Sequence, residues 1–356
     1  MATIRQTYWI IGARDLIRRF VHKCIVCRRQ RAETMQQIMG SLPSDRITSG
    51  ARAFVNTGVD FAGPVSLKTG RGRGSRTEKA WIALFVCLAV KAVHLELVTS
   101  LSTEAFIATL KRFIARRGKP KAMYSDNGTN FVGARKELRR LIASEEHNDK
   151  VTTYLQQDNV EWHFIPQRGS HFGGLWEAGI KSMKYHLRRV LGNVSLAYEE
   201  MYTTLCQIEA CLNSRPLTPL SSSPTDLQPL TPGHFLITTP LNQLPEEDLS
   251  EVKVNRLNRW QHLKQLHQHF WKRWSKEYLN QLQQRVKWRK EKRNLQKNDL
   301  VILKEENTPP AKWVLGRVED LHFGQDGKCR VVTVKTQNGT YTRPISKLVL
   351  ILEEDE

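Results

Sequence analysis

The sequence predicts a mixed α/β protein that continues into a basic helical region and an all-β segment. Three observations support this. Between residues 50 and 213, three strand-like runs are followed by a helix, a strand, a helix, a strand and two helices. Residues 255–297 are basic and helical in pattern, and residues 299–356 alternate as strands do. At 356 residues, the chain is long enough for two or three domains.

The strands of the α/β part are predicted from apolar runs rich in β-branched residues. They are Ala53–Val65, Trp81–Val90, Ala92–Val98, Ala122–Ser125 and Val160–Ile165. Gly63-Pro64 is expected to break the first of them, and a Gly- and Arg-rich loop over residues 70–76 should separate the first from the second.

The helices are predicted from the spacing of apolar residues and from their end signals. Ser102 can cap a helix that Gly118 and Pro120 end. Further helices are expected over residues 132–144, 174–191 and 197–213. In the last segment, strands are expected over residues 299–304, 313–321, 330–336 and 340–351, with Gly-containing turns between the last three. A small β-barrel is the expected outcome.

The net charge of +20, from 55 Lys and Arg against 35 Asp and Glu, favours a polyanionic partner such as nucleic acid. A charged surface that only keeps the protein soluble is the alternative. The longest apolar run, residues 81–90, is too short to span a bilayer. No secretory targeting core is evident at the N-terminus, so we expect a soluble intracellular protein. Of the six cysteines, Cys87, Cys206 and Cys211 are expected as buried free thiols, which fits a reducing compartment.

Three carboxylates stand at places where a folded α/β protein can bring them together. Asp60 interrupts an apolar strand, and Asp126 lies between a short strand and a helix. Glu177 follows a Gly-Gly pair at the start of a predicted helix. Carboxylates that converge from separate elements suit a pair of hard cations such as Mg²⁺, which support phosphodiester chemistry. The alternatives are an exposed edge-strand residue for Asp60 and ordinary Asp-Asn-Gly turn chemistry for Asp126.

The Glu177 helix has a predicted face of one acid and three bases. Lys181, Lys184 and Arg188 follow Glu177 at offsets of 4, 7 and 11, and therefore share its face. Such a face could place one carboxylate on a metal and the bases on nucleic-acid phosphates. The alternative is a simple surface ion pair between Glu177 and Lys181, worth a few tenths of a kcal/mol.

Taken together, the three acidic segments resemble the catalytic core of retroelement integrases of the ribonuclease H-like superfamily, and most closely those of Pao/BEL-type LTR retrotransposons. The matching residues are Val59-Asp60-Phe61-Ala62-Gly63-Pro64, Ser125-Asp126-Asn127-Gly128-Thr129-Asn130-Phe131 and Gly173-Gly174-Leu175-Trp176-Glu177. The 50 residues between Asp126 and Glu177 exceed the spacing of retroviral relatives. The extra residues lie around 135–154.

The resemblance implies a metal-dependent polynucleotidyl transferase that trims the 3′ ends of element DNA and joins them to target DNA. Asp60, Asp126 and Glu177 would hold two Mg²⁺ or Mn²⁺ ions and carry catalysis. The resemblance also implies DNA as partner, a homo-oligomer and a nuclear protein that is cytoplasmic before import. Two rival hypotheses are a nuclease on the same fold and an inactive or domesticated integrase copy that only binds DNA or chromatin.

The resemblance extends to both ends of the chain. Cys24 and Cys27 are similar to the second half of a His/Cys zinc module, whose two histidines would precede Tyr8. Because the first histidine of this sequence is His22, we expect a truncated module with an incomplete zinc site. The last strands resemble an SH3-like or chromodomain-like barrel. The expected domains are therefore a zinc-type module (1–45), a catalytic core (46–245), a basic helical linker (246–298) and a barrel (299–356).

DNA contacts are expected from basic residues in two regions of the chain. Near the core they are Arg168, Lys181, Lys184 and Arg188, and in the linker they are Lys287, Arg289 and Lys290. The linker also carries tryptophans that could stack on bases. The alternative is an amphipathic helix whose tryptophans pack on the core, and both readings can hold on opposite faces. The basic run from Arg285 to Arg293 is also compatible with a nuclear import signal.

Overall fold

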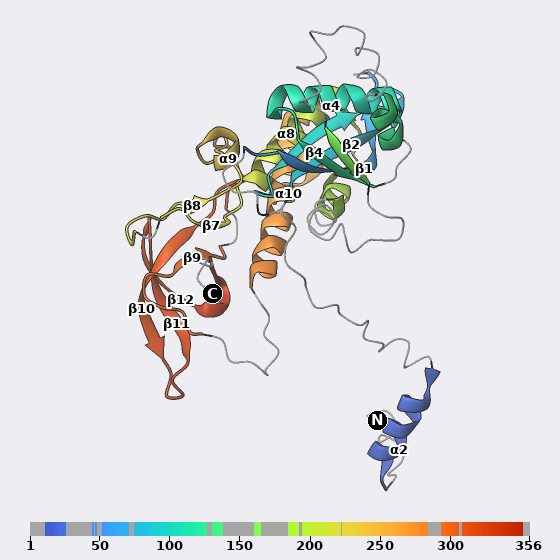
Figure 1. Cartoon of the computed structure of the whole chain (residues 1–356). Coiled ribbons are helices and arrows are strands. Elements are labelled where there is room, and N and C mark those ends of the chain that lie inside the picture. Colours follow the sequence, from blue (N-terminus) through green and yellow to red (C-terminus); the bar gives the residue numbers. More distant parts are fainter. Residues whose placement is uncertain are drawn as a thin grey trace. The chain divides into compact units, whose positions relative to one another are not determined.

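The computed structural model describes residues 11–25, 45, 47, 52–70, 75–126, 130–137, 160–164, 184–191, 194–221, 223–283, 293–305 and 308–351. Internal contacts divide the chain into two units, Met1–Pro43 and Ser44–Glu356. The first unit contains helix α2, Ala13–Lys23, which follows Gly12 in the left-handed conformation at φ 70°. The second unit contains all other elements labelled in Figure 1. None of the helices in these ranges combines the length and apolarity that a membrane span needs.

A mixed β-sheet forms the centre of the second unit. Its strands are β1 (Asn56–Lys68), β2 (Thr77–Cys87), β3 (Val93–Val98), β4 (Ala122–Ser125) and β5 (Glu161–Phe164). They lie in the order β3-β2-β1-β4-β5, and a short β6 (Leu196–Ala197) also pairs with β1. β2 is antiparallel to β1 and β3, whereas β4 is parallel to β1 and β5. The predicted mixed α/β architecture is confirmed.

The first strand has the predicted length but lies three residues further along the chain, at Asn56–Lys68 in place of the expected Ala53–Val65. β1 continues through Gly63-Pro64 to Lys68, and its register with β2 shifts between Ala62 and Val65. A β-bulge accommodates a proline that cannot donate to the ladder, so the expectation that this pair breaks the strand is wrong. Gly63 has φ 142°, and a Cβ on it would lie 3.0 Å from Cδ1 of Trp81. The close approach and the positive φ both require glycine here.

Helices cover both faces of the sheet. Successive residues of β2 point to opposite sides, and each set packs against different helices. Ala83, Phe85 and Cys87 join one core with residues of α4 (Thr103–Arg117). Ile82, Leu84 and Val86 join the other core with the helix over residues 184–191, α8 (Tyr198–Asn213) and α10 (Arg259–Leu282). Figure 1 shows α4 running along the sheet. The result is three layers, with α4 on one face and the later helices on the other.

The ends of α4 agree with the sequence prediction. The Ser102 side chain accepts a hydrogen bond from the Ala105 backbone N–H at 3.2 Å, and Gly118 ends the helix at φ 84°. This cap satisfies one of the free N–H groups of the first turn. The chain then enters β4 at Ala122, as predicted.

A buried ionic cluster joins β3, α4 and α8. Glu96 of β3 is fully buried and accepts from Arg112 Nε at 2.7 Å and from Arg116 Nη1 at 2.9 Å. His94, also buried, lies 3.2 Å from Glu96 and 3.1 Å from Glu209 of α8. Burial alone lowers the pKa of His94, but its hydrogen bonds to Glu209 and Glu96 outweigh that effect and raise it. Partners on all sides therefore compensate each buried charge.

The tryptophans of the basic helical region divide between the two predicted roles. Trp271 and Trp274 of α10 are buried, and Trp313 of the terminal segment packs edge-on against Trp271 with ring centroids 4.8 Å apart. Trp260 is 59% exposed. Trp288 lies outside the described residues. Packing on the core therefore accounts for two of these side chains, and Trp260 remains available to a partner.

The terminal segment forms a five-stranded antiparallel sheet. Its strands are β9 (Leu300–Leu303), β10 (Leu315–Phe323), β11 (Cys329–Thr336), β12 (Gly339–Pro344) and β13 (Leu348–Leu350). The order is β12-β11-β10-β9-β13. A 3₁₀ turn over Ile345–Lys347 divides the fourth predicted strand, so that β13 pairs with β9. A closed SH3-like barrel stays a prediction, because β12 and β13 stand at opposite ends of this order.

Short elements and thiols complete the described second unit. The short elements are β7 (Thr218–Pro219), β8 (Pro229–Leu230), α9 (His234–Ile237) and a 3₁₀ turn, Val254–Arg256. Cys87 and Cys211 are buried free thiols, as expected. Cys206 is exposed, so its expected burial is wrong. It lies five residues before Cys211 on α8, a spacing that places the two on different sides of a helix.

Candidate active site

β1 and the helix over residues 184–191 together position Asp60. Asp60 pairs with Leu84 of β2, whose side chain lies in the core beneath this helix. The carboxylate therefore points to the helix side of the sheet and is 29% exposed. Its Oδ1 accepts from the Phe61 backbone N–H at 2.6 Å, and its Oδ2 accepts from Lys184 Nζ at 2.6 Å. Asp60 is thus a fixed carboxylate with one oxygen on a displaceable ammonium group.

Asp126 lies on the strand next to Asp60 and at the same level. In the parallel ladder of β1 and β4, Gly58 pairs with Tyr124. Asp60 and Asp126 each follow their paired residue by two positions, and β4 ends at Ser125, so Asp126 is the first residue past the strand. The carboxyl end of a parallel strand is where α/β sheets place ligand sites. The structure therefore brings together two of the three predicted carboxylate positions.

A chain of hydrogen bonds and an aromatic stack hold the Asp126 segment in place beside its neighbouring strands. The Trp162 indole N–H of β5 donates to Ser125 Oγ at 2.9 Å, and that hydroxyl donates to the Asp126 carbonyl at 3.0 Å. Five residues after Asp126, the buried Phe131 stacks on Phe61 with centroids 5.3 Å apart. Because Phe61 directly follows Asp60, this stack links the two acid-bearing segments.

These supporting residues were not identified from the sequence. Phe61 and Phe131 lie within the segments that carry the acids, and their apolar character was the available signal. Their mutual contact depends on the β1–β4 pairing, which no local pattern shows. Ser125 and Trp162 gave no signal, because a serine before an aspartate is common in turns.

The remaining predicted site residues differ in how far the structure describes them. Lys184, which was expected to contact DNA, contacts the Asp60 carboxylate. Arg188 is exposed on the same helix. Cys24 directly follows α2 and is half-buried. The other predicted residues lie outside the described ranges; they are Glu177, Cys27, Arg168, Lys181, Lys287, Arg289 and Lys290.

The donor set of this site fits a divalent cation of the Mg²⁺ type. Asp60 and Asp126 supply carboxylate oxygens, the ligands that such hard cations prefer. Within the described ranges no group of three His, Cys, Asp or Glu side chains is close enough to hold a metal. The described part therefore contributes two carboxylates, and a third ligand is expected from Glu177. A cation there would replace the Lys184 ammonium group as the partner of Asp60.

A second pair of chemically active groups occurs in the core and is inert. Cys211 Sγ of α8 lies 3.2 Å from His267 Nε2 of α10. Burial raises the pKa of the Cys211 thiol to about 12 and lowers the pKa of His267 to about 4. Near neutral pH both groups are therefore uncharged, and a thiol in this state is a poor nucleophile. Thiol–imidazole catalysis is not supported at this position.

Comparisons with known proteins add the following findings. A family model described as a family of unknown function, DUF5641, matches residues 258–351, which hold α10 and the terminal sheet. No curated protein matches the chain. Among solved structures, the chain is similar to a simian T-cell lymphotropic virus intasome in complex with PP2A regulatory subunit B56 gamma. The identity is 12% and the TM-score 0.33, over 95% of this chain and 90% of that chain.

The chain is also similar to the HTLV-2 integrase catalytic core domain in complex with magnesium, in its trimeric form. Here the identity is 16% and the TM-score 0.31, over 48% of this chain and 93% of that chain. TM-scores this low do not establish a shared fold. The function of the chain is therefore inferred from its own residues and their arrangement.

Proposed function

We propose that this protein is a divalent-cation-dependent polynucleotidyl transferase that acts on DNA. The observation that carries the proposal is the equivalent placement of Asp60 and Asp126 on the neighbouring parallel strands β1 and β4. The opposing helix supplies Lys184 at 2.6 Å from Asp60. The net charge of +20 suits a nucleic-acid substrate.

In this proposal Asp60 and Asp126 bind the cations, together with Glu177. Glu177 precedes Lys184 by seven residues, a spacing that returns to the same face of a continuous helix. Mg²⁺ or Mn²⁺ held by these carboxylates would supply activation of an attacking oxygen and charge stabilisation of a leaving oxygen at phosphorus. The Phe61–Phe131 stack keeps the two aspartates in position. Lys184 is the partner of Asp60 before the cation binds, and Arg188 offers an exposed charge to a phosphate.

The finer part of the proposal is the type of transferase. The segments around Asp60, Asp126 and Glu177 resemble those of Pao/BEL-type retrotransposon integrases. We therefore propose 3′-end trimming and joining of element DNA by a nuclear homo-oligomer. A role for zinc at Cys24 and Cys27 is not part of this proposal, because two further ligands are required.

A disintegration assay tests the proposed activity on the full chain. A branched DNA that mimics the joined product is incubated with Mn²⁺ or Mg²⁺, and resealed target DNA is measured. We expect resealing by the wild type and a loss of at least about 10²-fold in Asp126→Asn, because a metal-binding carboxylate is removed. Asp320→Asn is the matched control, since Asp320 is an exposed carboxylate on β10 that pairs with Lys297 at 3.7 Å.

The result separates the enzyme from its two rivals. Hydrolysis of DNA without resealing would indicate a nuclease on this fold. Salt-sensitive DNA binding without any turnover would indicate an integrase-derived binding protein. Equal activity of the wild type and Asp126→Asn would refute the assigned site.

A further inference from the structure

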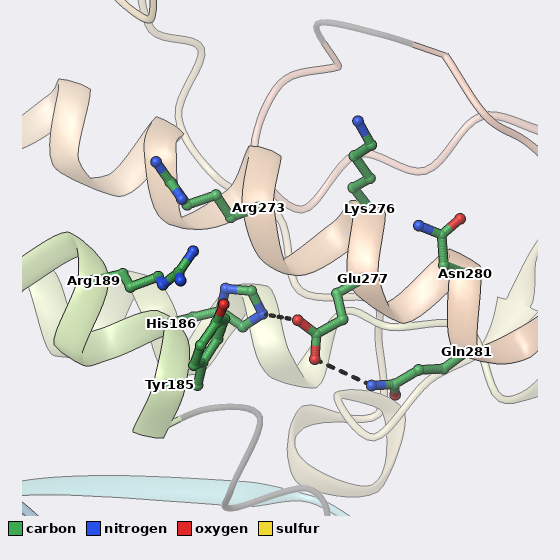
Figure 2. Close-up of a pocket in the computed structure, with 8 residues that line it drawn as sticks. All are labelled: Tyr185, His186, Arg189, Arg273, Lys276, Glu277, Asn280 and Gln281. Carbon is green, nitrogen blue, oxygen red and sulfur yellow. Dashed lines mark hydrogen bonds and ion pairs between the residues drawn. The ribbon is translucent and has the colours of Figure 1, made fainter. Parts of the chain in front are cut away.

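A basic pocket lies between the helix over residues 184–191 and α10, outside the candidate active site. Its volume is about 440 Å³. Figure 2 shows the side chains that line it: Tyr185, His186 and Arg189 come from the first helix, and Arg273, Lys276 and Glu277 come from α10. The two helices belong to the same layer of the fold, since Leu187 and Phe270 share one core.

Positive charge dominates this pocket. Arg189, Arg273 and Lys276 are exposed cations, against the single carboxylate of Glu277. That carboxylate is already engaged, because Oε2 lies 2.8 Å from His186 Nε2 and Oε1 accepts from Gln281 Nε2 at 3.2 Å. Arg189 also lies over the Tyr185 ring, 4.3 Å from its centroid. The pocket therefore presents two more positive charges than negative ones, on side chains that an incoming anion can reach.

His186 supplies a second, independent indication of a ligand. The residue is 3% exposed, and its Nδ1 has no hydrogen-bond partner among the described residues. Figure 2 shows its ring between Arg189 and Glu277, with one nitrogen directed at the carboxylate. A buried nitrogen that makes no hydrogen bond is costly unless a further group satisfies it. An oxyanion could accept from Nδ1 of the imidazolium, because both ring nitrogens are then donors.

The electrostatics of His186 are consistent with such an anion. Burial lowers the pKa of His186, and Arg273 and Arg189 lower it further, whereas Glu277 acts in the opposite direction. Lys276, also at this pocket, adds positive charge. An oxyanion between these groups would neutralise the cations and favour the protonated ring.

We propose that this pocket binds a backbone phosphate of nucleic acid, held by Arg189, Arg273, Lys276 and His186. Arginine presents paired N–H groups that match phosphate oxygens. His186 follows Lys184 by two residues on one helix, so the same helix contacts Asp60 and the phosphate. The assignment of DNA as the ligand rests on the proposed function, whereas the pocket itself does not depend on turnover.

Salt-dependent DNA binding tests this proposal on the full chain. Fluorescence anisotropy with a labelled duplex is measured between 50 and 200 mM salt for wild type and Arg273→Gln. We expect about five- to tenfold weaker binding at the lower salt concentration and a salt slope reduced by about 0.9, the loss of one phosphate contact. Lys272→Gln is the matched control. Lys272 is the adjacent residue of α10, is exposed, and pairs with Glu251 at 2.8 Å away from the pocket.

Because any lost cation weakens DNA binding slightly on so basic a chain, the comparison with Lys272→Gln is decisive. Equal effects of the two substitutions would overturn the proposal. Repeating the measurement in Asp126→Asn separates this site from the proposed activity. Wild-type-level DNA binding in Asp126→Asn that becomes about five- to tenfold weaker on adding Arg273→Gln supports the pocket even where turnover is absent.

A second readout identifies the source of the phosphate. The His186 ring is followed by NMR as a function of pH, with duplex DNA or with inorganic phosphate. We expect DNA to raise the pKa of His186 in the wild type, and to raise it less at the same DNA concentration in Arg273→Gln. A response to inorganic phosphate and none to DNA would make this a free-anion site and would contradict the proposal.

Discussion

At the scale of single residues, Lys184 is the contact that most changes the interpretation of the sequence. The helical spacing predicted that Lys184 shares a face with Glu177 and contacts DNA. In the structure, however, Lys184 Nζ donates to the Asp60 carboxylate at 2.6 Å. The two aspartates could be found from their segments, because an aspartate inside an apolar strand is unusual and one just past a strand lies where α/β sheets place ligand sites. The partner of Lys184 could not, since it is 124 residues away in the sequence.

Replacing Lys184 should strengthen cation binding. In Lys184→Gln, the ammonium group no longer competes for Asp60 and no longer repels a dication at the site. Both groups are about one third exposed, so an attraction of about 1 kcal/mol per charge pair at 4 Å is the appropriate scale. We expect Mn²⁺ affinity to rise about five- to tenfold, measured by titration of the free Mn²⁺ signal in electron paramagnetic resonance. An unchanged or weaker affinity would mean that Asp60 does not bind the cation.

At the scale of elements, local signals specified most of the central sheet and α4. Ser102 and Gly118 determine the ends of α4, and β4 has the predicted bounds. The errors lie where tertiary pairing overrides local signals. β1 passes through Gly63-Pro64 because β2 pairs with it on both sides of the bulge. The fourth predicted strand of the terminal sheet divides at Ile345–Lys347, because β13 pairs with β9 and not with β11.

The His94 cluster, which joins β3, α4 and α8, should make the free energy of unfolding depend on pH. The folded protein holds the His94 proton more tightly than the unfolded chain, since its pKa is raised. The stabilising effect is therefore complete below the ordinary histidine pKa of about 6.5 and is lost as pH rises through the raised value. Urea unfolding between pH 6 and 9 should show stability falling with pH in wild type. Subtracting the curve of His94→Gln should isolate this loss. A difference between the two proteins that does not vary with pH would contradict the assignment.

At the scale of the whole second unit, α10 joins the α/β part to the terminal sheet. On one side His267 of α10 contacts Cys211 of α8. On the other side the Trp271 indole N–H donates to the Thr308 carbonyl at 2.9 Å, and Trp313 packs on its ring. Sequence pattern identified this segment as basic and helical. Its many charged residues did not indicate that one face of the helix is buried. The basic linker of the sequence prediction is, over Arg259–Leu282, a packed helix.

Acid should weaken the attachment of α10 to α8 at His267. Burial lowers the pKa of His267 to about 4, below its value in the unfolded chain. The stability that depends on the neutral ring is present above pH 6.5 and is lost as pH falls towards 4. The loss amounts to about 3 kcal/mol for a shift of this size. Urea unfolding monitored by tryptophan fluorescence at pH 7 and 4.5 measures it, and His267→Gln should lose less between the two pH values. Equal losses would exclude His267 as the cause.

The central claim is that Asp60 and Asp126 hold one catalytic cation site, and anomalous diffraction from a crystal soaked in Mn²⁺ tests it most directly. The account predicts an anomalous peak within about 2.0–2.4 Å of a carboxylate oxygen from each aspartate, with Lys184 displaced from Asp60. The peak should be absent from Asp126→Asn crystals treated in the same way. Manganese bound elsewhere, or density on only one of the two aspartates, would contradict it.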